Sequence, residues 1–375
     1  MYILANLERK CLLMSIESDL KKDGITVIEP LDTTTVNVIA KNVSKKIVAA
    51  FSNLGFDFDT LYERFSKLPM YIADMPEGMS EASYFYKNSA IYFRDGMGLA
   101  DLEKFAVHEL IHNFQEQKNE KGDLTRLGLC TFKGSKPTGM ALNEAAVQLL
   151  ASNILENTFE TATYYDITFS TVSPNCYPLL CNLIYQMAYV TGEEVLFEST
   201  FNSNDHFKNK FTALCGENVY NQISNYFDKI LETEEKIIKI SNKIQKNELS
   251  TAKVDSLYRK SDELKKQLKS VYFSTQELII NSYFTNSLKT LITSDDVDIF
   301  RKKLYSFQDI IGTTTNYFFF NNYYIQMMEK LDSRYDSLSD YLDDDNTYLI
   351  PKKENKFTKI INYIKKLIWK KESVR

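Results

Sequence analysis

Residues 107–112 read VHELIH and hold two of the three histidines in this chain of 375 residues. On an α-helix of 3.6 residues per turn, His108 and His112 lie on one face and Glu109 projects beside them. Two histidines at this spacing can bind a zinc ion, and the carboxylate can act as a base. Because histidine is rare here, a chance HExxH is an event of order one in several hundred. The stretch therefore predicts a helix that carries a metal site.

The residues around this motif extend the helix and precede it with strands. Apolar side chains recur at helical spacing from Leu99 onward, Asp101 is the predicted N-cap, and residues 118–122 mark the end, which predicts a helix of about 17 residues. Upstream, LPMYIADMP (68–76) predicts a short strand and SYFYKNSAIYFRDG (83–96) a β-hairpin. Downstream, the glycine-rich residues 122–139 predict an irregular connection, and MALNEAAVQLLASNILE (140–156) predicts a second helix.

The chain after Pro178 predicts packed helices. No proline occurs between Pro178 and Pro351, and proline is the strongest breaker of helices. Apolar residues at spacings of three, four and seven predict an antiparallel helical hairpin over about 228–273. This hairpin is either an arm packed on its own chain or half of an intermolecular coiled coil.

The last residues, 351–375, predict a basic amphipathic tail. Apolar side chains gather on one face of the expected helix, and eight lysines lie elsewhere. Such a helix can make peripheral contact with an anionic membrane surface. The alternative is a terminal helix that docks its apolar face on the protein body. The acidic run 343–345 just before the tail suggests a flexible joint.

Composition excludes some classes of function. The net charge of -5 gives no reason to expect nucleic acid as a partner. Charges within the first twenty residues argue against a classical signal peptide, and no apolar run reaches the roughly 18 residues of a membrane span. Five cysteines without CxxC spacing predict reduced, mostly buried thiols. A cytoplasmic location is expected, and export by a non-classical route is the alternative.

A catalytic zinc ion needs a third protein ligand besides the two histidines. A third histidine at HExxHxxGxxH spacing is excluded, because the required positions hold Gln115 and Lys118. Glu116 would point along the helix surface rather than across the metal. Glu144 lies in an apolar helix, where a carboxylate is costly to bury unless a cation meets it. Glu144 is therefore the predicted third ligand, although it could also lie on the polar side of its helix.

The motif HELIH (108–112), followed by Asn143 and Glu144 on a later helix, resembles the gluzincin branch of the zincin metallopeptidases, typified by thermolysin-like enzymes. The specific match covers about residues 108–148. The order of strands and then a helix upstream of the motif is also similar. The resemblance is at the level of the superfamily.

The resemblance implies a role for each matching residue. His108, His112 and Glu144 would bind Zn2+. Glu109 would hold the attacking water, take its proton and pass it to the leaving amine. The strand over 89–94 would be the edge strand to which a peptide substrate adds by backbone hydrogen bonds.

The chain departs from this family in two respects, one of which is a longer connection between His112 and Glu144. Where thermolysin-like enzymes have an aspartate that orients a zinc histidine, this chain has Gln148, whose amide oxygen can still accept the imidazole N–H. Family members stabilise the oxyanion with a histidine or tyrosine from the later helical lobe. His206 is the candidate here, either in that role or as a surface or capping residue, and Tyr185 and Tyr189 are alternatives.

The sequence thus predicts an α+β fold with a zincin-like catalytic lobe, a small sheet before the HExxH helix, and a mainly α-helical second half. The predicted parts are a metallopeptidase domain, 1–215 (sheet and HExxH helix 1–121, connection 122–139, ligand helix and helical lobe 140–215), an α-helical domain, 216–350, and the tail, 351–375.

The function hypothesis is a zinc metallopeptidase that hydrolyses peptide or protein substrates with metal-activated water and Glu109 as general base. The alternative is a catalytically inactive zincin-like binding or scaffold protein that acts through the hairpin and tail. The intact Glu109 favours the hydrolase, because a structural zinc site needs no base.

Overall fold

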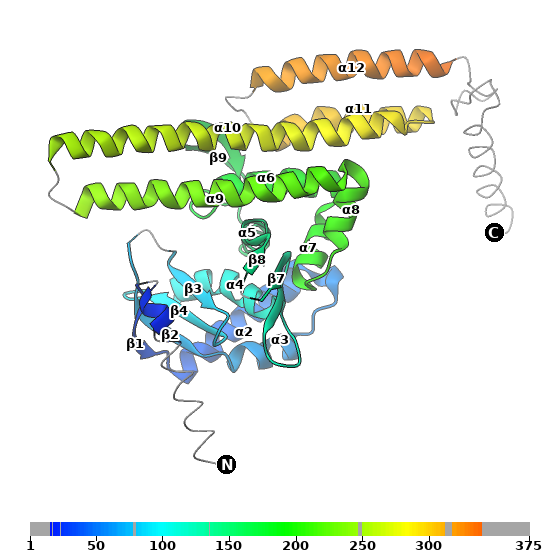
Figure 1. Ribbon diagram of the computed structural model, residues 1–375. Coiled ribbons are helices and arrows are strands. Elements are labelled where there is room, and N and C mark those ends of the chain that lie inside the picture. Colours follow the sequence, from blue (N-terminus) through cyan, green and yellow to red (C-terminus); the bar gives the residue numbers. More distant parts are fainter. Residues whose placement is uncertain are drawn as a thin grey trace, which may run out of the picture.

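The computed structural model describes residues 16, 18–22, 24–77, 80–134, 136–246, 250–311 and 317–339 (Figure 1). Helices and small β-sheets occur together in these residues, so the predicted α+β class is confirmed. The predicted tail, 351–375, and the acidic run before it lie outside the described residues. In the part that is described, no helix is both long and apolar enough to cross a membrane.

A four-stranded sheet lies in the first part of the chain. It comprises β1 (Thr26–Pro30), β2 (Met70–Asp74), β3 (Ala82–Phe85) and β4 (Ala90–Arg94), with α2 (Thr33–Ala50), η1 (Ser52–Leu54) and α3 (Phe58–Ser66) between β1 and β2, and α4 (Leu99–Gln115) after β4. The strand order is β1-β2-β4-β3, in which only β2 and β4 run parallel. Ile91 and Phe93 of β4 are fully buried in one core with residues of α2 and α4.

The predicted short strand and β-hairpin are confirmed as β2 and the antiparallel pair β3–β4. The prediction that residues 89–94 form the edge strand is wrong, because β4 lies between β2 and β3. Residues 90–93 of β4 are all buried, whereas three of the four residues of β3 are half-buried. A continuous apolar run of this kind favours an interior strand. The edge strand is therefore β3.

The helix that carries the HExxH motif, α4, has 17 residues, close to the predicted length. Its ends differ from the prediction. Gly98 is the N-cap, and Asp101 lies in the first turn, where its charge is favourable to the helix dipole. The helix ends at Gln115, because the next three residues pair as a strand instead.

The segment predicted as an irregular connection, 122–139, instead forms most of a second sheet. Its antiparallel strands are β5 (Glu116–Lys118), β6 (Leu124–Leu127), β7 (Cys130–Lys133) and β8 (Lys136–Thr138). Two of the glycines that suggested a loop lie in the connecting turns. Gly128 and Gly134 have φ angles of 56° and 61°, in the left-handed region that favours glycine. The strands are too short to show an apolar alternation in the sequence.

The rest of the described chain is mostly helical. After α5 (Met140–Ile154) come the strand pair β9 (Glu160–Tyr164) and β10 (Ile167–Thr171), and then α6 (Pro178–Thr191), α7 (Glu193–Phe201), α8 (His206–Cys215), α9 (Glu217–Lys246), α10 (Thr251–Lys289), α11 (Ser294–Ile311) and α12 (Tyr317–Ser339). The two longest helices, α9 and α10, lie side by side (Figure 1) and extend beyond the predicted 228–273. One buried cluster includes Val36 and Leu331, so the core is continuous across the boundary predicted at 216.

Helix α9 contacts two separate parts of the first half of the chain. Near the start of α5, Asp228 Oδ1 accepts the backbone N–H of Ala141 at 3.3 Å. Before β3, Asn242 Nδ2 donates to the backbone oxygen of Glu77 at 2.8 Å. The helix therefore connects α5 with the segment that leads into the edge strand.

Four cysteines, all those in the described ranges, are free. Cys130, Cys181 and Cys215 are buried, and Cys176 is half-buried. The prediction of unpaired, mostly buried thiols is confirmed for these four. Cys11 lies outside the described ranges.

Candidate metal centre

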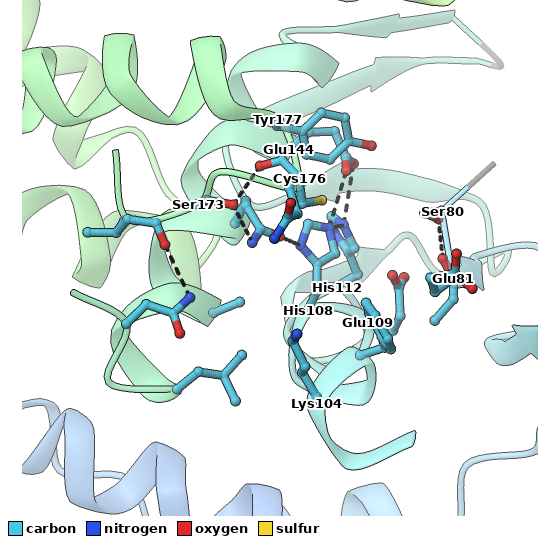
Figure 2. A pocket seen from close by; sticks show the side chains of 18 of the residues that line it. Ser80, Glu81, Lys104, His108, Glu109, His112, Glu144, Ser173, Cys176 and Tyr177 are labelled. Atoms are coloured by element: carbon cyan, nitrogen blue, oxygen red, sulfur yellow. Dashed lines mark hydrogen bonds and ion pairs between the residues drawn. The ribbon is translucent and has the colours of Figure 1, made fainter. Parts of the chain in front are cut away.

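Helix α4 directs both histidines of the motif toward α5 (Figure 2). His108 and His112 are one turn apart, and their Nε2 atoms are 3.0 Å from each other. Val107, Leu110 and Ile111 are fully buried. Their packing fixes the rotation of α4 about its axis, so the histidines are held on the open side of the helix.

Helix α5 brings Glu144 to the two histidines. Its Oε1 is 3.3 Å from His112 Nε2, and its Oε2 is 3.3 Å from His108 Nε2. The ligand atoms of the three residues all lie within 4.8 Å of one another. Donor atoms on a tetrahedral zinc ion, with bonds of about 2.0–2.1 Å, are roughly 3.3 Å apart. The spacing fits zinc, and Glu144 is where the sequence predicted the third ligand.

The charges in this cluster also suit a cation. Burial lowers the pKa of His108, but the hydrogen bond to Glu144 and the charges of Glu109 and Glu144 outweigh burial and raise that pKa to about 8. Burial raises the pKa of Glu144, whereas the two histidines hold it well below its ordinary value, so its carboxyl group is ionised. A carboxylate this buried needs a positive partner. A metal ion held by the three side chains would supply it.

Glu109 projects from α4 toward the edge strand. Its Oε2 accepts the backbone N–H of Tyr84 at 2.7 Å. Tyr84 is opposite Ile91, whose own N–H bonds to Pro69 on the other side of β4. In an antiparallel pair this means that the backbone N–H of Tyr84 points away from β4. The candidate base and the open edge of the sheet therefore meet beside the histidines.

The cluster lies in a cleft of about 1020 Å³ (Figure 2). The cleft is lined by residues 80–84 and Tyr86, from β3 and its flanks, by residues 172–177, and by residues of α4, of α5 and of the segment after α5. Ligand pockets typically measure about 300–1,000 Å³. The cleft is therefore large enough for several residues of a peptide.

Tyr177 enters the cleft immediately before α6. The centroid of its ring is 6.2 Å from that of His108, and its side chain lies beside the carboxylate of Glu144 (Figure 2). The charge of Glu144 and burial raise the pKa of Tyr177 well above its usual value, so the hydroxyl keeps its proton. Tyr177 has φ 48° and ψ 43°, a left-handed conformation that costs a non-glycine residue roughly 1–2 kcal/mol. Such strain gathers at functional sites.

The structure does not bring His206 to the metal cluster. His206 begins α8, its side chain is 58% exposed, and its Nδ1 lies 2.8 Å from Glu198 Oε2. Tyr185 and Tyr189 do not line the cleft either. Sequence analysis missed Tyr177, because nothing marks it among 24 tyrosines except its position before a proline that begins a helix.

A buried polar network joins α4 to α5 next to the cluster. Asn143 Oδ1 accepts the N–H of Leu129 at 2.9 Å, and Asn143 Nδ2 donates to Gln115 Oε1 at 3.3 Å. Gln115 Nε2 donates to the backbone oxygen of Thr200 at 2.9 Å. A Cβ atom at Gly128 would lie 2.1 Å from Asn143 Oδ1 and 2.5 Å from Gln115 Nε2. The network therefore fixes α4 against α5 and requires glycine at 128.

Comparison of the chain with family models, curated proteins and solved structures finds no match.

Proposed function

We propose that this chain is a zinc metallopeptidase that hydrolyses peptide bonds. One observation carries the proposal: the ligand atoms of His108, His112 and Glu144 converge in a cleft in which Glu109 reaches the open edge of a sheet. Three ligands on one side leave a fourth position for a reactant, as catalytic zinc sites do. A structural zinc site needs neither the cleft nor the nearby carboxylate.

The arrangement of elements supports a zincin-like lobe. A small sheet with an exposed edge strand precedes α4, and α5 follows with the third ligand. This is the order that the resemblance to gluzincins implies. The resemblance also assigns substrate binding to an edge strand, which in this chain is β3.

A peptide can bind by adding a strand to β3. Its carbonyl oxygen would accept the N–H of Tyr84, which now donates to Glu109 Oε2. Substrate binding would then release the carboxylate of Glu109 from the strand. The base becomes available at the moment when the peptide is in place.

The residues of the chain then have distinct tasks. When bound, zinc supplies a Lewis acid that polarises the carbonyl and lowers the pKa of water. Glu109 takes the proton of the attacking water and gives it to the leaving amine. The protonated hydroxyl of Tyr177 donates a hydrogen bond to the oxygen on which negative charge develops.

Metal content and peptide hydrolysis test this proposal together. We expect one zinc ion per wild-type chain, lost from Glu144→Ala, and cleavage of members of a peptide library. Glu109→Gln should keep zinc but lose turnover. Glu103→Gln is the matched control, because Glu103 is on the same helix but binds Asn42 at 2.6 Å.

Three results would count against the peptidase. Hydrolysis by Glu109→Gln at the wild-type rate would exclude Glu109 as the base. A wild-type chain that binds no zinc after loading would exclude the metal site. Zinc binding without cleavage of any peptide would favour the inactive binding or scaffold protein instead.

A further inference from the structure

A chain of hydrogen bonds leads from His108 to the segment of residues 172–177, which also lines the cleft. His108 Nδ1 lies 2.9 Å from Gln148 Oε1. Gln148 Nε2 donates to Ser173 Oγ at 2.9 Å. Ser173 Oγ donates to the backbone oxygen of Cys176 at 2.6 Å, next to Tyr177. The side chains of Gln148 and Ser173 thus connect a proposed metal ligand, His108, with the segment that carries Tyr177 (Figure 2).

The donor and acceptor in each of these hydrogen bonds follow from the last acceptor, the backbone oxygen of Cys176. A backbone carbonyl can only accept, so the hydroxyl proton of Ser173 goes to Cys176. Ser173 Oγ must then accept from the amide NH2 of Gln148. This leaves Gln148 Oε1 toward the imidazole, so Nδ1 of His108 must carry a proton. In the neutral ring Nε2 is then unprotonated and faces Glu144 and His112, as a metal ligand requires.

An amide side chain alone would not fix this tautomer. If the Gln148 amide were turned over, its NH2 would donate to Nδ1 and the proton of His108 would be on Nε2. Ser173 would then have to donate to the amide oxygen and would lose its bond to Cys176. The aspartate found at this position in thermolysin-like enzymes avoids the ambiguity, because a carboxylate can only accept.

We propose that Ser173 is a positioning residue that sets the tautomer of His108 through Gln148 and links it to the position of the Cys176–Tyr177 segment. Ser173 is 3% exposed, so water does not readily replace its hydroxyl. The inference rests on the proposed metal site, because only a metal makes the unprotonated Nε2 necessary. The group that can adopt two alternative orientations is the side-chain amide of Gln148.

The test uses the full chain without metal, with its ring nitrogens labelled with 15N. The chain has three histidines, so NMR can report the tautomer of each at a pH where all are neutral. We expect His108 to be protonated on Nδ1 in the wild type and to be a mixture of tautomers in Ser173→Ala. Zinc affinity, measured by competition with a chelator, should fall about tenfold in Ser173→Ala.

Two further variants separate this role from a loss of folding. Ser152→Ala removes a buried hydroxyl that has no partner in the described structure, on the helix that carries Gln148, and should change neither readout. The double variant Ser173→Ala/Gln148→Glu should restore the Nδ1 proton and most of the zinc affinity, because a carboxylate needs no serine to orient it.

Ser173→Ala with the wild-type tautomer and the wild-type zinc affinity would overturn the proposal. So would a wild-type His108 that is protonated on Nε2. A double variant that stays mixed would show that Gln148 does not transmit the effect. The NMR experiment contains no zinc or substrate, so its result is independent of whether the chain proves to be a peptidase.

Discussion

Replacement of Gly128 by alanine should destabilise the protein far more than the same change at Gly134. Both glycines have left-handed φ angles, 56° and 61°. Around Gly134 no atom lies within 4 Å of an added Cβ, whereas at Gly128 the Cβ would be 2.1 Å from Asn143 Oδ1. Comparison of Gly128→Ala with Gly134→Ala therefore separates the free-energy cost of a left-handed alanine from the cost of displacing the buried side chains.

The magnitude can be estimated from the bonds involved. Left-handed alanine costs roughly 1–2 kcal/mol at either site. At Gly128 the side chains of Asn143 and Gln115 must also move. This movement breaks the hydrogen bond of Asn143 with Leu129, that of Gln115 with Thr200, and the one that joins the two side-chain amides. Each buried polar group left without a partner costs about 1–3 kcal/mol. With the Leu129 N–H and the Thr200 carbonyl both left without a partner, we expect Gly128→Ala to lose roughly 3–8 kcal/mol in total.

Urea unfolding of the two variants measures this difference. The free energy of unfolding should fall several-fold more for Gly128→Ala than for Gly134→Ala. Since Asn143 precedes Glu144, zinc affinity should weaken in Gly128→Ala only. Equal losses of stability at both positions would refute the claim that the network requires glycine at 128.

Other predictions concern single side chains. Tyr177→Phe should lower kcat by about 10²–10³-fold with little change in KM, as for loss of an oxyanion donor; an unchanged kcat would remove Tyr177 from that role. His206→Ala should leave kcat and KM unchanged, because His206 lies outside the cleft; a large fall in kcat would contradict this. Burial raises the pKa of Glu234 to about 8, above its unfolded value of about 4.3. The contribution of Glu234 to stability is thus fully present below about pH 4.3 and is lost as pH rises through about 8. Glu234→Gln should raise the free energy of unfolding at pH about 9 by a few kcal/mol and flatten its dependence on pH; identical pH profiles in chemical denaturation would contradict the reasoning.

The sequence correctly predicted features that depend on the spacing of residues within one helix. The spacing of His108 and His112 on a periodic helix, and a glutamate in the apolar helix of residues 140–156, predicted three side chains that converge in the structure. Helical periodicity fixes which residues share a face, and the cost of a buried carboxylate indicates that a cation lies nearby.

The sequence did not predict features that depend on contacts between residues far apart in the chain. The position of β3 at the edge follows from the pairing of β2 with β4, which short-range patterns do not contain. The second sheet is built from strands of three or four residues. Tyr177 reaches Glu144 only because α6 packs against α5. Each of these features is set by tertiary contacts rather than by local propensity.

Helix α9 holds the start of α5 and the segment before β3 at a fixed separation. Asp228 holds the start of α5 and Asn242 holds the segment before β3. Asn242 comes fourteen positions after Asp228 on the helix, which is about 21 Å at 1.5 Å per residue. An insertion of one residue between them would rotate Asn242 by about 100° and carry it away from Glu77. The length of one uninterrupted helix therefore sets the distance between the start of α5 and the segment before β3, and an insertion keeps Asn242 on the side of Glu77 only if it is close to a whole number of turns.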